Sequence, residues 1–252
     1  MSLKMKALVA LCAVACSSSL YAQELKVYGA GGPAPAFKAA VAQFEKDTGV
    51  KVAFVAGPTS AWIAAAKEDA DVLFSGSENM MSDFAAALGP QVDPAQAEPL
   101  YMRPMVLVVR PGNPKHIGGF EDLFKPGVKV EVVNGSGLSG VWEDMAGRDG
   151  NIGHLRALRH NIVSYAKNSG EAKQIWSEHA DIDVWLTWNI WQAGNQQLGE
   201  VVKIEPRYAL FRDTGVVITQ KGHAHPAAAR LLDYLKSPSG AAFFEAKGWL
   251  TN

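Results

Sequence analysis

Hydroxyl and glycine residues recur where a predicted strand ends and a predicted helix begins. They form four groups: residues 29–33, Thr59 with Ser60, Ser75 with Ser77, and residues 136–140. Hydroxyl and backbone N–H groups can hold a buried oxyanion when each donates a good hydrogen bond. Because the carboxyl ends of parallel strands share one edge of a sheet, the four groups are expected to converge on one anion. The alternative is that each hydroxyl only caps its helix.

The first of these groups also permits a nucleotide interpretation. Gly29, Gly31 and Ala34 satisfy the spacing GxGxx(G/A) of a dinucleotide-binding turn. That site also needs an acidic residue at the end of the next strand, where residues 55–57 are Val-Ala-Gly. We therefore expect no nucleotide or other cofactor. The glycines are interpreted as allowing a ligand to approach backbone N–H groups, with a purely structural turn as the alternative.

Enzyme chemistry is weakly supported. The loop of residues 134–140 is rich in Gly and Ser, yet the chain contains no G-x-S-x-G elbow of a hydrolase. A spatial catalytic triad leaves no such signature, so an exported hydrolase stays an alternative to the expectation of no enzyme activity. His223 and His225 flank Ala224, but a metal site needs three or four ligands, and we expect no metal.

Three arginines could pair with a ligand phosphate or carboxylate. They are Arg148 after a predicted helix, Arg212 in a late extended run and Arg103 in an earlier one. Ordinary surface salt bridges are the alternative for each. One or two arginines in a cleft would favour a phosphate ester or a polycarboxylate, whereas neutral donors alone would favour sulfate or molybdate. Tryptophans spaced by three over 185–191 could stack on a sugar, although core packing is the favoured interpretation.

Composition limits the class of protein. The 252 residues suffice for one large domain or two lobes. Because 24 Lys and Arg balance 25 Asp and Glu, no nucleic-acid partner is expected. Lys4 and Lys6 precede an apolar run over 7–15, which predicts a signal peptide at 1–22 and a periplasmic location. Both cysteines, Cys12 and Cys16, lie inside this leader, with lipidation at Cys16 as an alternative.

The first half of the chain alternates predicted strands and helices. After the strand that begins at Leu25, the expected elements are a helix at 34–47 ended by Gly49, a strand at 50–55, a helix at 61–69 capped by Ser60, a strand at 71–74 and a helix at 78–88. This βαβαβα order favours a parallel sheet with helices on both faces.

The second half repeats the alternation between two long extended runs. The first run, at 101–110, leaves one lobe, and the second, at 201–204 and 208–218, returns to it. Between and after them the expected elements are strands at 128–133, 162–165 and 183–187, and helices at 141–147, 154–161, 169–180 with an Asn168 or Ser169 cap, 226–236 and 240–246. We therefore expect an α/β protein in which residues 23–102 and 206–252 form lobe 1 and residues 103–205 form lobe 2.

Several motifs resemble one family. They are VYGAGGP at 27–33, GPTSAW at 57–62, DADVLFSGSE at 69–78, SGVWEDMAGR at 139–148, NSG at 168–170, DVWLTW at 183–188 and PSGAAFFEAKGWL at 238–250. The chain is similar in these to the accessory colonization factor AcfC group, within the type II periplasmic solute-binding proteins that include molybdate and sulfate binders. The resemblance implies two lobes, each a mixed, mostly parallel sheet flanked by helices, joined by two hinge crossings.

The resemblance also implies a function and a site. It implies capture of a small anionic solute, either an oxyanion or a phosphorylated or carboxylated acid, in the interlobe cleft for an ABC-type transporter permease or a chemoreceptor ectodomain. A monomer or a homodimer is expected, and closure would pivot around 102–109 and 204–211. A surface adhesin with a vestigial cleft is the alternative. The ligand-binding residues carried over are Ala30, Gly31, Thr59, Ser60, Ser75, Ser77, Ser136, Ser139, Gly140, Arg148 and Arg212.

Overall fold

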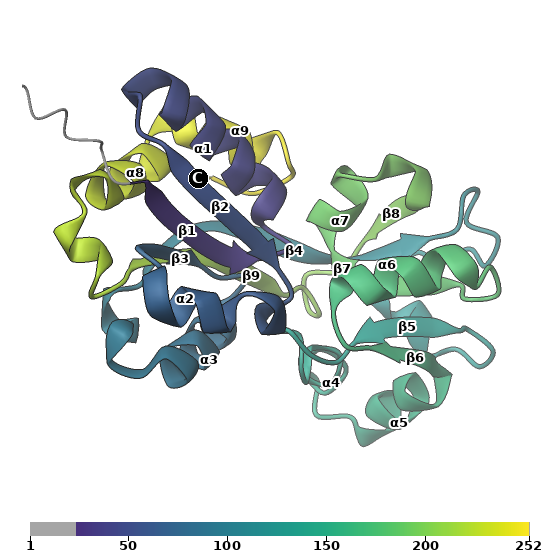
Figure 1. The fold of residues 1–252 in the computed structure, drawn as a ribbon. Coiled ribbons are helices and arrows are strands. Elements are labelled where there is room, and N and C mark those ends of the chain that lie inside the picture. The colour runs from purple at the N-terminus through teal and green to yellow at the C-terminus, as the bar shows by residue number, and fades with distance from the viewer. Residues whose placement is uncertain (1–23, 252) are drawn as a thin grey trace, which may run out of the picture.

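The molecule has two α/β halves joined by long strands that run through its centre (Figure 1). The computed structural model describes residues 24–251. The leader predicted at 1–22 lies outside the described residues, as does residue 252. In the described part, no helix is both long and apolar enough to cross a membrane.

Residues 24–251 contain nine strands and nine α-helices. The strands are β1 (Leu25–Ala30), β2 (Val52–Gly57), β3 (Val72–Phe74), β4 (Glu98–Val109), β5 (Val130–Val133), β6 (Ile162–Ala166), β7 (Val184–Trp188), β8 (Glu200–Lys203) and β9 (Phe211–Ile218). The helices are α1 (Ala34–Thr48), α2 (Ile63–Asp69), α3 (Glu78–Leu88), α4 (Val141–Ala146), α5 (Ile152–Asn161), α6 (Ser169–Glu178), α7 (Asn189–Ala193), α8 (Pro226–Lys236) and α9 (Pro238–Glu245).

Strand β4 carries the chain from one half to the other. The strand order is β2-β1-β3-β9-β4-β7-β5-β6, with β8 also paired to β4. The first part of β4 pairs antiparallel with β9, from Glu98 opposite Val216 to Pro104 opposite Phe211. Its second part pairs antiparallel with β7 and β8. The other strand pairs in each half, apart from β3 with β9, are parallel. The lobe boundaries stay a prediction.

Helix α1 shows how the first half is packed. It begins after Pro33 and ends at Gly49, whose φ of 73° makes the left-handed C-cap that the sequence predicts. Its buried face places Phe37 against Phe74 of β3, with ring centroids 4.1 Å apart. Helices α1, α8 and α9 pack together on one side of this sheet, and α2 packs with α3 on the other (Figure 1).

Most predicted elements agree with the structure, and helices α3 and α8 agree at both ends. The cap predicted at Ser60 is wrong. Residues 59–61 form a 3₁₀ turn, and α2 begins at Ile63 without a side-chain cap. Trp62 explains the shift, because its buried indole donates a hydrogen bond from Nε1 to the Gly57 carbonyl at 3.2 Å and fixes the turn.

A carboxyl group lies buried inside the second half, on β5. Glu131 is fully buried, and the nearest hydroxyl, Ser164 Oγ, is 3.5 Å from its Oε1. Oε2 has no hydrogen-bond partner, and neither does the indole N–H of Trp185, its neighbour in register on β7. Burial raises the pKa of Glu131 from 4.5 to about 8, because the ionised form is poorly solvated there.

The stability of the Glu131→Gln variant is expected to increase relative to that of the wild type as the pH rises. Because the pKa of Glu131 is higher in the folded state, its protonation stabilises the wild type fully below about pH 4.5, and this stabilisation is lost as the pH rises through about 8. Glutamine does not titrate, so the variant keeps its stability over this range. Its free energy of unfolding should therefore increase relative to that of the wild type by up to about 1.4 kcal/mol per pH unit between those values. Urea denaturation at pH 5, 7 and 9 measures the gain. The exposed Glu68→Gln is the control, and a constant difference between the wild type and Glu131→Gln would contradict the assignment.

Candidate functional site

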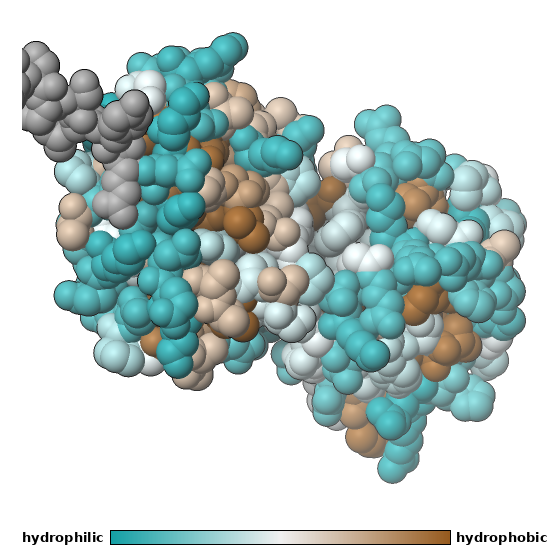
Figure 2. All heavy atoms as spheres, in the orientation of Figure 1, coloured by the Kyte–Doolittle hydropathy of each residue, from teal (hydrophilic) through white to brown (hydrophobic). Residues whose placement is uncertain are grey.

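A cavity of about 160 Å³ lies where the two halves meet. The space-filling view shows the surface indented between the halves, whose outer faces are largely hydrophilic (Figure 2). Both halves contribute to the walls. The lining residues are 30–33, 57–59, Gly76, Met80, Arg103, Ser136, Leu138, 168–170, Trp188 and Trp191.

Three helices of at least ten residues begin at the cavity. They are α1 after Pro33, α3 after Ser77 and α6 after Asn168. The first N–H groups of a helix have no partner within the helix, and they form the positive end of its dipole. Side chains satisfy one such group at two of these ends, since Ser77 Oγ accepts from Met80 N at 3.2 Å and Asn168 Oδ1 from Glu171 N at 3.0 Å. The arrangement favours a bound anion.

One wall contains a buried cation, Arg103 of β4. Arg103 is only 3% exposed to solvent. Nη1 donates to the carbonyl of Asp213 at 3.2 Å, and Nη2 donates to the carbonyl of Gly76 just before α3. Its Cζ lies 4.6 Å from the ring centroids of both Trp188 and Trp249, which is a cation–π arrangement.

The charge of Arg103 is only partly compensated. No carboxylate oxygen in residues 24–251 lies within salt-bridge distance of the guanidinium, and its Nε–H has no hydrogen-bond partner. Burial lowers the pKa of Arg103 to about 9, opposed by the more distant Asp213 carboxylate. The guanidinium therefore stays protonated at neutral pH, and an anion in the cavity would supply the missing negative charge.

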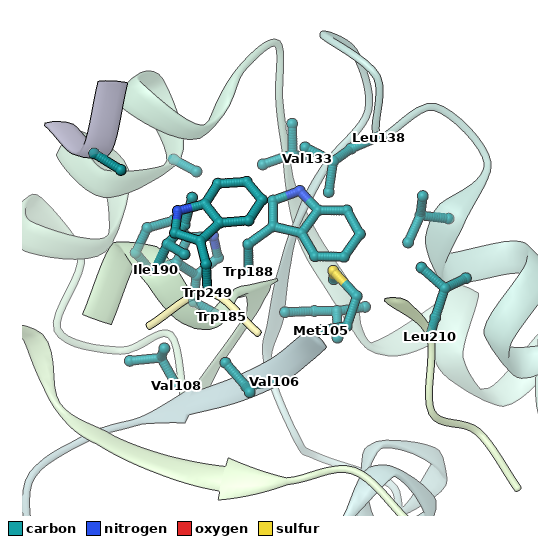
Figure 3. Close-up of a cluster of buried hydrophobic side chains, with 14 of the residues drawn as sticks. Met105, Val106, Val108, Val133, Leu138, Trp185, Trp188, Ile190, Leu210 and Trp249 are labelled. Atoms are coloured by element: carbon teal, nitrogen blue, oxygen red, sulfur yellow. The ribbon is translucent and has the colours of Figure 1, made fainter. Parts of the chain in front are cut away.

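Apolar side chains form another part of the cavity wall. Met80 comes from α3, Leu138 from the loop before α4, Trp188 from the end of β7 and Trp191 from α7. Figure 3 shows Leu138 and Trp188 within the same cluster of buried side chains as Met105 and Leu210. The core packing favoured from the sequence is confirmed for Trp185 and Trp188, and Trp188 and Trp191 also line the cavity. Stacking on a sugar stays a prediction. The site suits an anion that also has a hydrocarbon part.

Four residues predicted from the sequence line this cavity: Ala30, Gly31, Thr59 and Ser136. Ala30 and Gly31 precede α1, and Thr59 begins the 3₁₀ turn after β2. Ser136 adopts a left-handed backbone with φ 48°, and its Oγ lies 3.5 Å from the carbonyl of Lys167. The structure therefore brings residues from three of the four predicted groups to one volume.

Ser75 and Ser77, the remaining group, are buried beside the cavity and do not line it. The carbonyl of Ser75 accepts from Thr214 Oγ1 at 2.6 Å, and Ser75 Oγ accepts from Gly215 N at 3.4 Å. Ser77 Oγ is the N-cap of α3. The capping alternative is therefore confirmed for Ser77 alone, since Ser75 Oγ binds a distant backbone group on β9. Gly76, between the two serines, reaches the cavity.

Five other predicted residues lie elsewhere. Ser60 and Ser139 are exposed outside the cavity lining, and Gly140 is the left-handed N-cap of the short helix α4. Arg148 and Arg212 line a separate open hollow of about 600 Å³ beside the crossing strands. Glu78 and Asp213 share that hollow, and burial together with the nearby Asp213 carboxylate raises the pKa of Glu78.

The role of Gly29 differs from the one interpreted from the sequence, which was to let a ligand approach the backbone. A Cβ atom at this position would lie 2.4 Å from the Phe74 ring, so the glycine is required by strand packing. At Gly31 a Cβ atom would lie 3.4 Å from the Gly57 backbone, which brings the turns after β1 and β2 together. The glycine corner therefore shapes the cavity partly through contacts within the protein.

Sequence reasoning omitted two parts of the site from the predicted set. Arg103 was one of three arginines, and no local pattern separated it from Arg148 and Arg212. Residues 168–170 were expected to begin a helix, which is confirmed, but not to face the ligand. Strand β6, which precedes α6, could have indicated that residues 168–170 lie at the site. It is parallel to β5, so the two strands end at the same edge of the sheet.

Comparison with known proteins identifies the family. The family model described as bacterial extracellular solute-binding protein matches residues 25–250. The chain belongs to this family. No match was found among curated protein sequences.

Solved structures of the same architecture agree with this assignment. Peb3 from Campylobacter jejuni is 32% identical, with a TM-score of 0.84, covering 91% of this chain and all of the other. A structure of L-phospholactate-bound PEB3 has the same identity and coverage and a TM-score of 0.85. The sulfate-binding protein SubI from Mycobacterium tuberculosis H37Rv is 18% identical, with a TM-score of 0.73, covering 90% of this chain and 86% of the other.

A molybdate-binding protein completes the comparison. The periplasmic molybdate-binding protein of Azotobacter vinelandii is 22% identical, with a TM-score of 0.69, covering 91% of this chain and all of the other. At these identities the sulfate and molybdate binders show the fold alone. They confirm the predicted class, an α/β protein with the type II periplasmic binding protein fold.

Gly137→Ala is expected to disturb a close approach of the two halves beside the cavity. Gly137 has φ +80°, and a Cβ atom there would lie 2.7 Å from Ser77 Oγ on the opposite half. The substitution should cost about 1–2 kcal/mol for the left-handed backbone and about 1–3 kcal/mol more for the overlap. Gly127→Ala is the control, because Gly127 has φ +81° with open space around it. Equal losses of unfolding free energy in the two variants, measured by urea denaturation, would contradict a close contact between the halves at Gly137.

Proposed function

We propose that this protein captures a small organic anion in the cavity between its halves, without transforming it. One observation carries the proposal: the guanidinium of Arg103 is buried in the cavity wall with no carboxylate partner among residues 24–251. A buried charge is costly unless it is paired, and three helix N-termini at the same cavity add positive potential. Both features favour an anionic ligand.

The lining of the cavity favours an organic anion over a bare oxyanion. Four apolar side chains form part of the cavity wall, and a bare oxyanion has no hydrocarbon part to contact them. An arginine at the site also favours a phosphate ester or a polycarboxylate. The PEB3 structure with L-phospholactate bound is consistent with this class of ligand.

Binding is proposed to close two lobes around the ligand. The lobes would be residues 23–102 with 206–252 and residues 103–205, pivoting around 102–109 and 204–211. Such a ligand touches both halves, because Gly31 and Thr59 lie on one and Ser136 and Asn168 on the other. A ligand shifts an open–closed equilibrium only through contacts that differ between the two states. The closed form would then be recognised by a membrane permease of ABC type or by a chemoreceptor ectodomain, with the protein a monomer or a homodimer.

We also propose a periplasmic location after cleavage of the leader at 1–22, and membership of the accessory colonization factor AcfC group. The export-signal pattern supports the first proposal, and the motifs of residues 27–33 and 139–148 support the second. An adhesin with a vestigial cleft is the competing function. It predicts adhesion to host cells without any stabilising anion.

A thermal-shift screen tests the proposal. The anions are sulfate, molybdate, phosphate, 3-phosphoglycerate, L-phospholactate, citrate and acidic amino acids. Phosphorylated or carboxylated acids are expected to raise the melting temperature more than inorganic oxyanions, because they fill both the polar and the apolar parts of the cavity. If no anion raised it while host-cell adhesion persisted, the adhesin alternative would replace ligand capture. Turnover of a bound ester would instead support the hydrolase.

Arg103→Lys is expected to weaken the best anion of that screen at least tenfold. A hydrogen bond to a charged group contributes about 1.5–3 kcal/mol, and lysine keeps the charge but loses the planar fork. Isothermal titration calorimetry measures the change. Arg230→Gln, at an exposed position of α8, is the control and should leave the affinity within about twofold, since bulk salt screens so exposed a charge. Wild-type affinity in Arg103→Lys would refute the site.

A further inference from the structure

The segment Gly248–Leu250 is fixed beside Arg103 at two points. Leu250 exchanges two backbone hydrogen bonds with Met102, the residue before Arg103, at 2.8 and 3.1 Å. Asn189, the residue after Trp188, donates from Nδ2 to the Gly248 carbonyl at 2.6 Å. Trp249 is therefore held between β4 on one side and the start of α7 on the other.

The indoles of Trp188 and Trp249 both contact the guanidinium of Arg103. Each ring centroid lies 4.6 Å from Cζ, and the tryptophans are 2% and 4% exposed. The two labelled indoles lie next to each other in the cluster of Figure 3. A cation against the face of a tryptophan ring is attracted most strongly when it is desolvated, as it is here. The N–H groups of a guanidinium lie in its plane, so Arg103 donates hydrogen bonds from its edge.

We propose that Trp249 and Trp188 are positioning residues, which hold the edge of Arg103 toward the cavity and so set its affinity for anions. An edge-on guanidinium binds two oxygens side by side, as carboxylates and phosphates present them. The inference rests on the proposed function, and it assigns to Gly248–Leu250 a part in binding although Trp249 is absent from the cavity lining.

A purely structural role for Trp249 is the competing explanation. Its ring packs edge-on against Phe244 of α9 at 6.1 Å, within the core. Loss of this packing alone would lower stability and leave the affinity of the folded protein unchanged. The two roles are therefore separated by comparing phenylalanine, which keeps an aromatic face, with leucine, which keeps only apolar volume.

The first test needs no ligand. Nuclear magnetic resonance of the arginine side chains reports on Arg103, with its signal assigned from Arg103→Lys. Ring currents from two indoles should displace the Nε–H signal of Arg103 in the wild type. We expect the displacement to be lost in part in Trp249→Leu and largely kept in Trp249→Phe. An unchanged signal in a folded Trp249→Leu variant would overturn the positioning role, whether or not the protein binds anions.

The second test measures affinity for 3-phosphoglycerate and for sulfate by isothermal titration calorimetry. Trp249→Leu is expected to weaken binding about tenfold, and Trp249→Phe by less than about threefold. Trp176→Leu is the matched control, because Trp176 is buried and lies 3.5 Å from the guanidinium of Arg110, away from the cavity. It should lower the melting temperature and leave the affinity within about twofold.

Asn189→Ala supplies a milder variant that keeps both indoles. It removes the hydrogen bond to Gly248 and is expected to weaken binding about threefold, as the segment loses one of its two anchors. If Trp249→Leu does not fold, unchanged affinity in Asn189→Ala overturns the inference. Equal losses of affinity in the Phe and Leu variants would show that an aromatic face at position 249 is not what matters, and would also overturn the inference. If the wild type binds no anion, the proposed function is wrong and the predicted effect on affinity fails with it. The resonance test still decides whether Trp249 contacts Arg103.

Discussion

The centre of this molecule depends on one buried positive charge. Arg103 lies in the wall of the cavity, and within residues 24–251 its compensation comes from two carbonyl oxygens, two indole rings and the more distant Asp213 carboxylate. None of these is a salt bridge. Such an environment holds a guanidinium in place without neutralising it, so its electrostatic potential stays available to a ligand. The three helix N-termini around the cavity act in the same direction.

The groups that hold Arg103 come from distant parts of the chain. Gly76 precedes α3, Asp213 is on β9, Trp188 ends β7 and Trp249 follows α9. Arg103 itself lies near the point where β4 exchanges β9 for β7 and β8 as its neighbours. Arg103 also lies within 102–109, one of the two segments proposed as pivots. The proposed ligand contact and the proposed pivot therefore share this side chain.

Local patterns predicted the fold well and the site only in part. Helix α1 follows from the spacing of Phe37, Val41 and Phe44 and from Gly49, because both signals are local. The cap at Ser60 failed because burial of Trp62 outweighs a capping hydrogen bond. Ser75 and Ser77 follow a strand as the pattern requires, yet their hydroxyls are used by the protein itself.

The site residues that sequence reasoning did not select depend on long-range pairing. Arg103 and Arg212 are opposite each other in register, and only one of them reaches the cavity. Which of the two does so depends on how β4 and β9 twist and on where Trp249 docks, neither of which is encoded near either arginine. The same holds for residues 168–170, whose place opposite α1 results from the arrangement of the two halves.

The sheet order also constrains how the chain folds. Strand β3 has β9 as one of its neighbours, and its residue Val72 pairs with Ile218, although most of the described chain separates the two residues in sequence. The parallel pairs in each half join strands that are much closer in sequence. Because closing a long loop costs entropy before any contact repays it, the pairing of β9 with β3 is expected to follow these shorter-range pairs. The placement of β9 also brings Asp213 to Arg103, so the proposed anion site would be completed in the same step.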